Sequence, residues 1–255
     1  MNTKSIKKPW RKWLRIGFIT YGLVAVTYLS SGYRTVDIDE NILISDATIS
    51  VMESPEVLQF TPPNYTAALI FISGSGVSSH AYAPMLRPIA EQDYGVFIIK
   101  LPYRFAMLES HRMQAIDRAL KVISDHPEVA TWVVSGHSLG GALASRIARD
   151  HADLIDAMAL VGTTHPKADD LSSLSIPVTK VYGSNDGIAP TEKIIANKHL
   201  LPQHTTYVLI AGGNHSQFGH YAGQFLDGEA TISRDDQQAE TRTAILEMLA
   251  IATNR

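Results

Sequence analysis

The sequence contains no cysteine among its 255 residues. This absence excludes disulfide bonds, thiolate nucleophiles and zinc sites held by cysteine. The net charge is also small, at −3, and the sequence has no basic patch interleaved with aromatic residues. Nucleic-acid binding is therefore not expected. The histidines show no H-E-x-x-H or similar spacing, so no metal is expected. No cofactor is predicted. A composition of 45% hydrophobic and 18% charged residues is typical of one large globular domain.

The N-terminal segment differs from the rest of the chain in charge and hydropathy. Residues 1–15 contain six lysines and arginines and no acid, and residues 16–33 contain no charge. A helix of 18 residues is about 27 Å long, just enough to cross the hydrocarbon core of a membrane. We therefore expect a transmembrane signal anchor at 16–33, with a cytoplasmic N-terminus and the domain outside a bacterial-type inner membrane. The alternatives are a cleaved signal peptide and secretion, although the sequence has no clear A-x-A site, and a helix buried in the core of the fold.

Apolar runs alternate with amphipathic segments along the remainder of the chain. This alternation predicts an α/β fold, with a mostly parallel sheet of about eight strands flanked by helices and no insertion large enough for a lid. Ligands bind such sheets at the carboxyl ends of the strands. The expected units are a basic segment (1–15), the anchor (16–33), a linker with the first strand (34–54) and the α/β domain (55–255). Strands are expected at 41–52, 57–60, 67–72, 96–101, 131–135, 155–161, 178–182 and 205–210, and helices at 82–92, 111–125, 138–150, 191–198 and 237–252.

The stretch Gly136-His137-Ser138-Leu139-Gly140 is the most informative part of the sequence. It follows an uncharged β-branched and aromatic run at 130–134 and precedes good helix formers at 141–149. A strand, Gly-x-Ser-x-Gly and a helix together form a nucleophile elbow, a sharp turn that presents a serine hydroxyl above the end of a sheet. Side chains in place of the two glycines would collide with the neighbouring strand and helix. Ser138 is therefore the candidate nucleophile, and His137 is expected to point elsewhere.

A nucleophilic serine requires a base and an acid that orients the base, and both are expected in loops that follow strands. In the chain order nucleophile, acid, base, Asp186 follows the strand expected at 178–182. His215 follows the strand expected at 205–210 through a short glycine loop. We predict Asp186 as the acid and His215 as the base. The weaker alternatives are Asp169 or Asp170 for the acid and His220 for the base.

Backbone N–H groups are expected to stabilise the oxyanion that forms during acyl transfer. One donor should be the N–H of Leu139, and the other should come from the glycine-rich loop after the strand at 67–72. In that loop, Ser75 is the first choice and Gly76 the second. The alternative interpretation is a phosphate cradle, but the loop lacks the lysine of a P-loop and the spacing of a dinucleotide fingerprint.

Several segments together resemble the α/β-hydrolase superfamily, and within it the compact dienelactone-hydrolase-like branch, often called α/β-hydrolase family 5. The resemblance covers about residues 55–252 and implies a Ser138–Asp186–His215 triad and hydrolase chemistry. Dienelactone hydrolases themselves have cysteine where this chain has Ser138, so their substrate is not carried over. The matching segments are 71–77, 81–84, 100–103, 136–141, 182–187, 212–219 and 227–234.

These observations predict a membrane-anchored serine hydrolase that cleaves carboxylic esters, with thioesters and small amides as further candidates. The expected partners are a small acyl ester substrate and, through residues 16–33, a membrane; no oligomeric state is predicted. Arg104 is a candidate for binding an anionic substrate, with a solvent-facing side chain as the alternative. Gln217 and residues 227–234 are expected to fold over the site and shape it. A non-catalytic binding domain at the cell envelope and an acyltransferase are the alternative functions.

Overall fold

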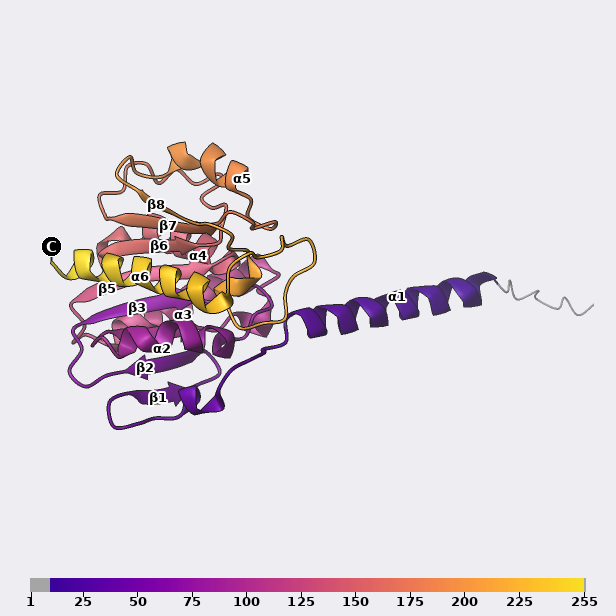
Figure 1. Cartoon of the computed structure of the whole chain (residues 1–255), viewed down its shortest axis with the longest axis horizontal. Helices are drawn as coiled ribbons and strands as arrows, with labels where there is room; N and C mark the ends of the chain where they lie inside the picture. Colours follow the sequence, from indigo (N-terminus) through magenta and orange to yellow (C-terminus); the bar gives the residue numbers. More distant parts are fainter. Residues whose placement is uncertain (1–9, 255) are drawn as a thin grey trace, which may run out of the picture.

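The computed structural model describes residues 10–254 and contains one eight-stranded sheet between two layers of helices (Figure 1). The strand order is β1-β2-β4-β3-β5-β6-β7-β8. β2 pairs antiparallel with β1 and β4, and all other neighbours are parallel, which confirms the predicted mostly parallel sheet. The strands are β1 (Ser50–Glu53), β2 (Val57–Thr61), β3 (Ala67–Ile72), β4 (Gly95–Ile99), β5 (Thr131–His137), β6 (Ala157–Val161), β7 (Val178–Gly183) and β8 (Thr206–Ile210).

Two apolar cores lie on the two faces of the sheet. On one face α2 and α6 pack over side chains such as Phe71, and on the other α3 and α4 pack over side chains such as Ile70. Successive side chains of a strand point to opposite faces, so a strand covered on both faces is apolar along its whole length, as β3 is. The helices are α1 (Trp10–Gly32), α2 (Ala83–Ala90), α3 (Glu109–Asp125), α4 (Leu139–Asp150), α5 (Thr191–Ala196) and α6 (Arg234–Thr253).

The first predicted strand is wrong over most of its length. Residues 41–49 contain the end of a 3-10 helix (Glu40–Leu43) and a turn, and β1 begins only at Ser50. The Asp39 carboxylate accepts the N–H two residues ahead at 3.0 Å, and the Asp46 carboxylate accepts two N–H groups in the same way. Such side-chain-to-backbone bonds compete with strand pairing. The weak alternation of apolar and polar residues in this segment was therefore not enough to form a strand.

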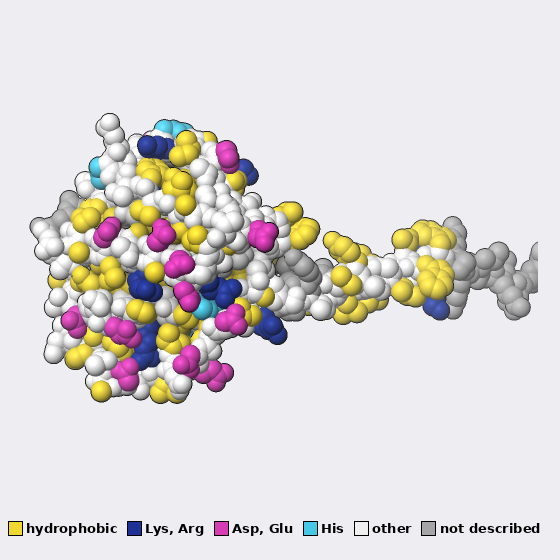
Figure 2. All heavy atoms as spheres, viewed as in Figure 1, with side chains coloured by type: hydrophobic (Ala, Val, Ile, Leu, Met, Phe, Trp, Pro, Cys, Tyr) yellow, Lys and Arg dark blue, Asp and Glu magenta, His cyan; other side chains and the backbone are white. Residues whose placement is uncertain are grey.

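Helix α1 projects away from the domain and does not fulfil the prediction of a transmembrane anchor at 16–33. Among residues 10–254, no helix is both long enough and apolar enough to cross a membrane. The first turns of α1 carry Arg11, Lys12 and Arg15, and about half of the remaining positions are glycine, serine, threonine or tyrosine. Apolar side chains nonetheless lie exposed along it (Figure 2), with Phe18 at 79%. Residues 1–9 of the predicted basic segment lie outside the described residues.

Lys180 places an ammonium group inside the apolar core. It lies in β7, is 1% exposed and donates a hydrogen bond to the carbonyl of His165. Burial lowers the pKa of Lys180 to about 7. An unfolded lysine has a pKa of about 10.4, so between about pH 7 and 10 the unfolded chain binds more protons than the folded one. The linkage relation then requires stability to rise with pH across this window and to fall as pH drops through it.

We expect the free energy of unfolding to increase by about 2 kcal/mol between pH 7 and pH 9 because of Lys180. Urea unfolding at both pH values measures this difference. In Lys180→Met the increase should largely disappear, whereas the exposed Lys193→Met should keep it. An equal pH dependence in all three proteins would contradict a lowered pKa for Lys180.

Candidate active site

Ser138 lies in the sharp turn between β5 and α4, as predicted for a nucleophile elbow. Its backbone has φ 54° and ψ −115°, a strained conformation for a residue other than glycine. The N–H of Ser138 donates to the carbonyl of Val161 at 3.0 Å, which fixes the turn against β6. A Cβ at Gly140 would lie 1.9 Å from the Ile72 carbonyl oxygen, and one at Gly136 would lie 2.4 Å from Gly140. The close approach of strand and helix therefore requires both glycines.

The structure brings Asp186 and His215 together at the carboxyl ends of β7 and β8. The Nδ1 of His215 lies 2.8 Å from Oδ2 of Asp186, and both side chains are 0% exposed. The other carboxylate oxygen of Asp186 accepts the N–H groups of Ile188 at 2.9 Å and Ala189 at 2.6 Å. These bonds orient the carboxylate toward the imidazole. An Nδ1–H donated to Asp186 leaves the lone pair of His215 on Nε2, the atom that can accept a proton.

The Nε2 atom of His215 is buried and has no hydrogen-bond partner within residues 10–254. Beside it lies the ring of His137, with 4.5 Å between the ring centroids. His137 therefore belongs to the surroundings of the base, contrary to the expectation that it points elsewhere. The N–H of Gly74 donates to the Tyr82 hydroxyl at 3.0 Å, and this hydroxyl lies 2.9 Å from Nδ1 of His137.

Burial, reinforced by the neighbouring His215, lowers the pKa of His137 well below its usual value. His137 is consequently neutral near pH 7. A neutral imidazole at this place adds no positive charge next to His215, so it does not oppose protonation of His215 as a second cation would. The bond to the Tyr82 hydroxyl fixes the His137 ring in place.

The loop after β3 leaves one N–H group available among those predicted to hold an oxyanion. The N–H of Gly76 donates to the carbonyl of Arg104 at 2.8 Å, and the N–H of Val77 donates to Gly74. The Ser75 hydroxyl donates to the carbonyl of Phe105 at 2.9 Å.

For the N–H of Ser75, the described part of the chain offers no acceptor. Leu139 is the first residue of α4, where N–H groups have no partner within the helix.

Asp227 connects the loops that carry Asp186 and His215, and the sequence did not single it out as a site residue. One carboxylate oxygen accepts the N–H of His215 at 3.1 Å and the N–H of Gly187 at 3.2 Å. The other accepts the N–H and the hydroxyl of Ser216 at 2.8 and 2.6 Å. Residues 227–234 were expected to fold over the site, but nothing in the local sequence shows that the Asp227 carboxylate points toward the His215 loop.

The remaining predicted residues lie at the margins of this arrangement. The Gln217 side chain donates to the carbonyl of Ile232 at 3.3 Å, so its amide faces the segment before α6; its role in shaping the site stays a prediction. The alternative acids are engaged elsewhere: Asp169 pairs with Arg149, and Asp170 accepts the N–H of Ser172. Among the described residues, the ring nitrogens of His220 have no hydrogen-bond partner.

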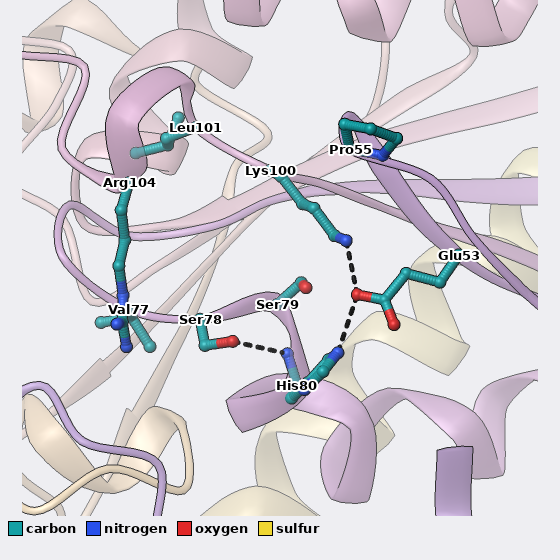
Figure 3. Close-up of a pocket in the computed structure, with 9 residues that line it drawn as sticks. All are labelled: Glu53, Pro55, Val77, Ser78, Ser79, His80, Lys100, Leu101 and Arg104. Atoms are coloured by element: carbon teal, nitrogen blue, oxygen red, sulfur yellow. Dashed lines mark hydrogen bonds and ion pairs between the residues drawn. The ribbon is translucent and has the colours of Figure 1, made fainter. Parts of the chain in front are cut away.

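Arg104 lines a cavity of about 250 Å³ next to the loop after β3, together with Val77 (Figure 3). Across the cavity Glu53 pairs with Lys100 and, at 2.8 Å, with His80. Arg104 is exposed, and it forms no ion pair with an acid in the part of the chain described. Its uncompensated charge is compatible with the predicted binding of an anionic substrate, which stays a prediction.

The model of the alpha/beta hydrolase family matches residues 68–239, about two thirds of the chain. This segment includes the elbow, the Asp186–His215 pair and Asp227. The chain therefore belongs to the alpha/beta hydrolase family. No curated protein matches the sequence.

Solved structures share the fold at low sequence identity. Est1E from Butyrivibrio proteoclasticus is 14% identical with a TM-score of 0.58, over 80% of this chain and 100% of Est1E. A predicted CIB-like hydrolase from Thermoplasma acidophilum is 15% identical with a TM-score of 0.61, over 78% of this chain and 99% of its own. A dienelactone hydrolase-like promiscuous phosphotriesterase from metagenomic libraries is 12% identical with a TM-score of 0.60, over 81% and 99%.

Proposed function

We propose that this protein is a serine hydrolase that cleaves carboxylic esters through an acyl-enzyme on Ser138. The observation that carries the proposal is the buried Asp186–His215 pair, held at the same edge of the sheet as the strained Ser138 elbow. A buried imidazole with its Nδ1–H on a carboxylate is the arrangement that general-base catalysis requires. Ferulic acid is bound to Est1E in one related structure, and another relative is a ferulic acid esterase from Streptomyces cinnamoneus. These relatives support an ester as the substrate.

In the first half of the reaction, Ser138 Oγ forms a bond to the acyl carbon while its proton moves to Nε2 of His215. The negative charge on the former carbonyl oxygen is stabilised by the N–H groups of Ser75 and Leu139, each worth about 3 kcal/mol in comparable sites. The ester C–O bond then breaks, and His215 returns the proton to the leaving alkoxide. Asp186 stabilises the imidazolium form throughout.

In the second half, water attacks the acyl-enzyme and gives its proton to Nε2 of His215. The bond between the acyl carbon and Ser138 Oγ breaks, Oγ regains the proton, and a carboxylic acid leaves. An alcohol in place of water would give a new ester. Product analysis in the presence of added alcohols therefore distinguishes a hydrolase from an acyltransferase.

Reaction of the full chain with a fluorophosphonate tests this proposal. We expect one equivalent of probe to bind and the turnover of short-chain p-nitrophenyl esters to be lost in parallel with labelling. A folded protein that neither reacts with the probe nor cleaves any ester would overturn the proposal and favour a non-catalytic binding domain.

The Asp227 contacts lead to a prediction about the base. Asp227→Asn replaces one carboxylate oxygen by an amide nitrogen, which donates and cannot accept, so one of the two sets of bonds that hold the His215 loop is lost. We expect kcat/KM to fall by about tenfold to a hundredfold, because a displacement of about 1 Å at a reacting group has effects of this size. Ester kinetics measure the change, with the exposed Asp153→Asn as the matched control. Equal activity of the two variants would show that Asp227 does not position His215.

A further inference from the structure

Residues 33–37, here called the strap, connect α1 to the domain and lie outside the segment 68–239 that matches the family model. The strap runs alongside the chain that follows His215. The N–H of Val36 donates to the carbonyl of His220 at 3.0 Å, and Thr35 pairs with Tyr221 as an antiparallel bridge. In Figure 1, α1 meets the domain at the carboxyl end of the sheet, next to the long loop that precedes α6. The strap is thus bonded to the loop that carries the proposed base.

The ring of Tyr33 lies between three loops of the site. It packs edge-on against Phe105, with 5.8 Å between centroids, and stacks on Tyr221 at 6.3 Å. It also lies directly over Gly76, because a Cβ at that position would be 2.8 Å from Cδ1 of Tyr33. Gly76 has φ +80°, so glycine is favoured there by both its conformation and the close approach of the ring.

A chain of hydrogen bonds runs from the strap to the proposed oxyanion donor. The carbonyl of Tyr33 accepts a hydrogen bond from Nη2 of Arg104 at 2.7 Å. The carbonyl of Arg104 in turn accepts the N–H of Gly76 at 2.8 Å. Gly76 follows Ser75, whose N–H is the free donor of this loop. Fixing the Gly76 N–H therefore restricts the rotation of the preceding backbone and the direction of the Ser75 N–H.

We propose that the strap is part of the active site and that Tyr33 is a positioning residue for the Ser75–Gly76 backbone. This inference rests on the proposed esterase function. Tyr33 acts through its ring on Gly76 and through its carbonyl on Arg104, while Thr35 and Val36 hold the segment after His215. Oxyanion donors contribute only when they are fixed before the reaction. A chain that begins after residue 33 would lack the Tyr33 ring, and we expect it to have a lower kcat even though it keeps the whole segment 68–239.

Three variants of the full chain test the role of Tyr33. Tyr33→Ala removes the ring and should lower kcat by about tenfold or more while changing KM by less than about threefold, because the loss falls on the transition state. Tyr33→Phe keeps the ring and should retain kcat within about threefold. Tyr21→Ala is the matched control, since Tyr21 is 74% exposed on α1. Melting temperatures show that the variants are folded, and hydrogen exchange of residues 74–77 should be faster in Tyr33→Ala alone.

Wild-type kinetics and exchange in Tyr33→Ala would overturn the inference. If Tyr33→Ala does not fold, Arg104→Met decides when it is assayed with a neutral ester, for which the bond of Arg104 to the strap matters and its charge does not. A lower kcat then supports the inference and an unchanged kcat overturns it. If the wild type hydrolyses no ester, the proposed function fails by itself. The exchange measurement then decides whether the strap fixes the loop, with unchanged exchange counting against it.

Discussion

Replacing Ser138 with alanine is expected to lower kcat/KM for p-nitrophenyl esters by at least about ten thousandfold. Without Oγ no acyl-enzyme can form, and what remains is the effect of substrate binding and of the backbone donors on direct attack by water. Steady-state kinetics with an acetate or butyrate ester measure the loss. The oxyanion donors are backbone groups and remain in place, so binding of the substrate should change little.

A control variant and a melting temperature show whether the loss of activity comes from the missing hydroxyl or from misfolding. Ser173→Ala, in an exposed loop, serves as the matched control and should keep full activity. The melting temperature of Ser138→Ala should stay close to that of the wild type, because the half-buried hydroxyl makes no bond needed for the fold. A loss of less than about tenfold in a folded Ser138→Ala protein would rule out Ser138 as the nucleophile.

Replacing Asp186 with asparagine is expected to lower kcat/KM by about a thousandfold to ten thousandfold. The carboxylate that now accepts the Nδ1–H of His215 at 2.8 Å would become an amide. An amide N–H facing Nδ1 favours the tautomer with the proton on Nε2, which cannot accept the proton of Ser138. The two N–H groups of Ile188 and Ala189 can still bond the amide oxygen, so the loop should keep its conformation.

Asp153→Asn is again the control. Activity within about tenfold of the wild type would exclude Asp186 as the partner of the base.

The sequence alone predicted the features that depend on neighbouring residues, namely the buried strands and the loops that follow them. The strand β3 is a continuous apolar run, β5 and β7 are buried along almost their whole length, and the loops that follow these strands carry Ser75, Ser138 and Asp186. Because parallel strands present their carboxyl ends at one edge, residues far apart in sequence meet there. The contact between Asp186 and His215 follows from this rule together with the order of the strands.

Other features depend on contacts between distant segments, and the sequence alone did not reveal them. The segment 227–234 was expected over the site, but the bonds between the Asp227 carboxylate and the His215 loop depend on contacts that the sequence does not show. His137, the last residue of β5, lies against His215, which follows β8, and this contact joins two segments far apart in the sequence. For α1, the count of uncharged residues suggested a membrane span, but glycine and polar residues make the helix less apolar than a span requires.

Locating the fluorophosphonate adduct by peptide mass spectrometry of the labelled full chain is the most direct test of the central claim. We expect a single adduct on Ser138, formed in the wild type and absent from Ser138→Ala, with His215→Ala reacting far more slowly because no base accepts the proton of Oγ. An adduct on another residue, or equal labelling of the wild type and Ser138→Ala, would show that Ser138 is not the nucleophile.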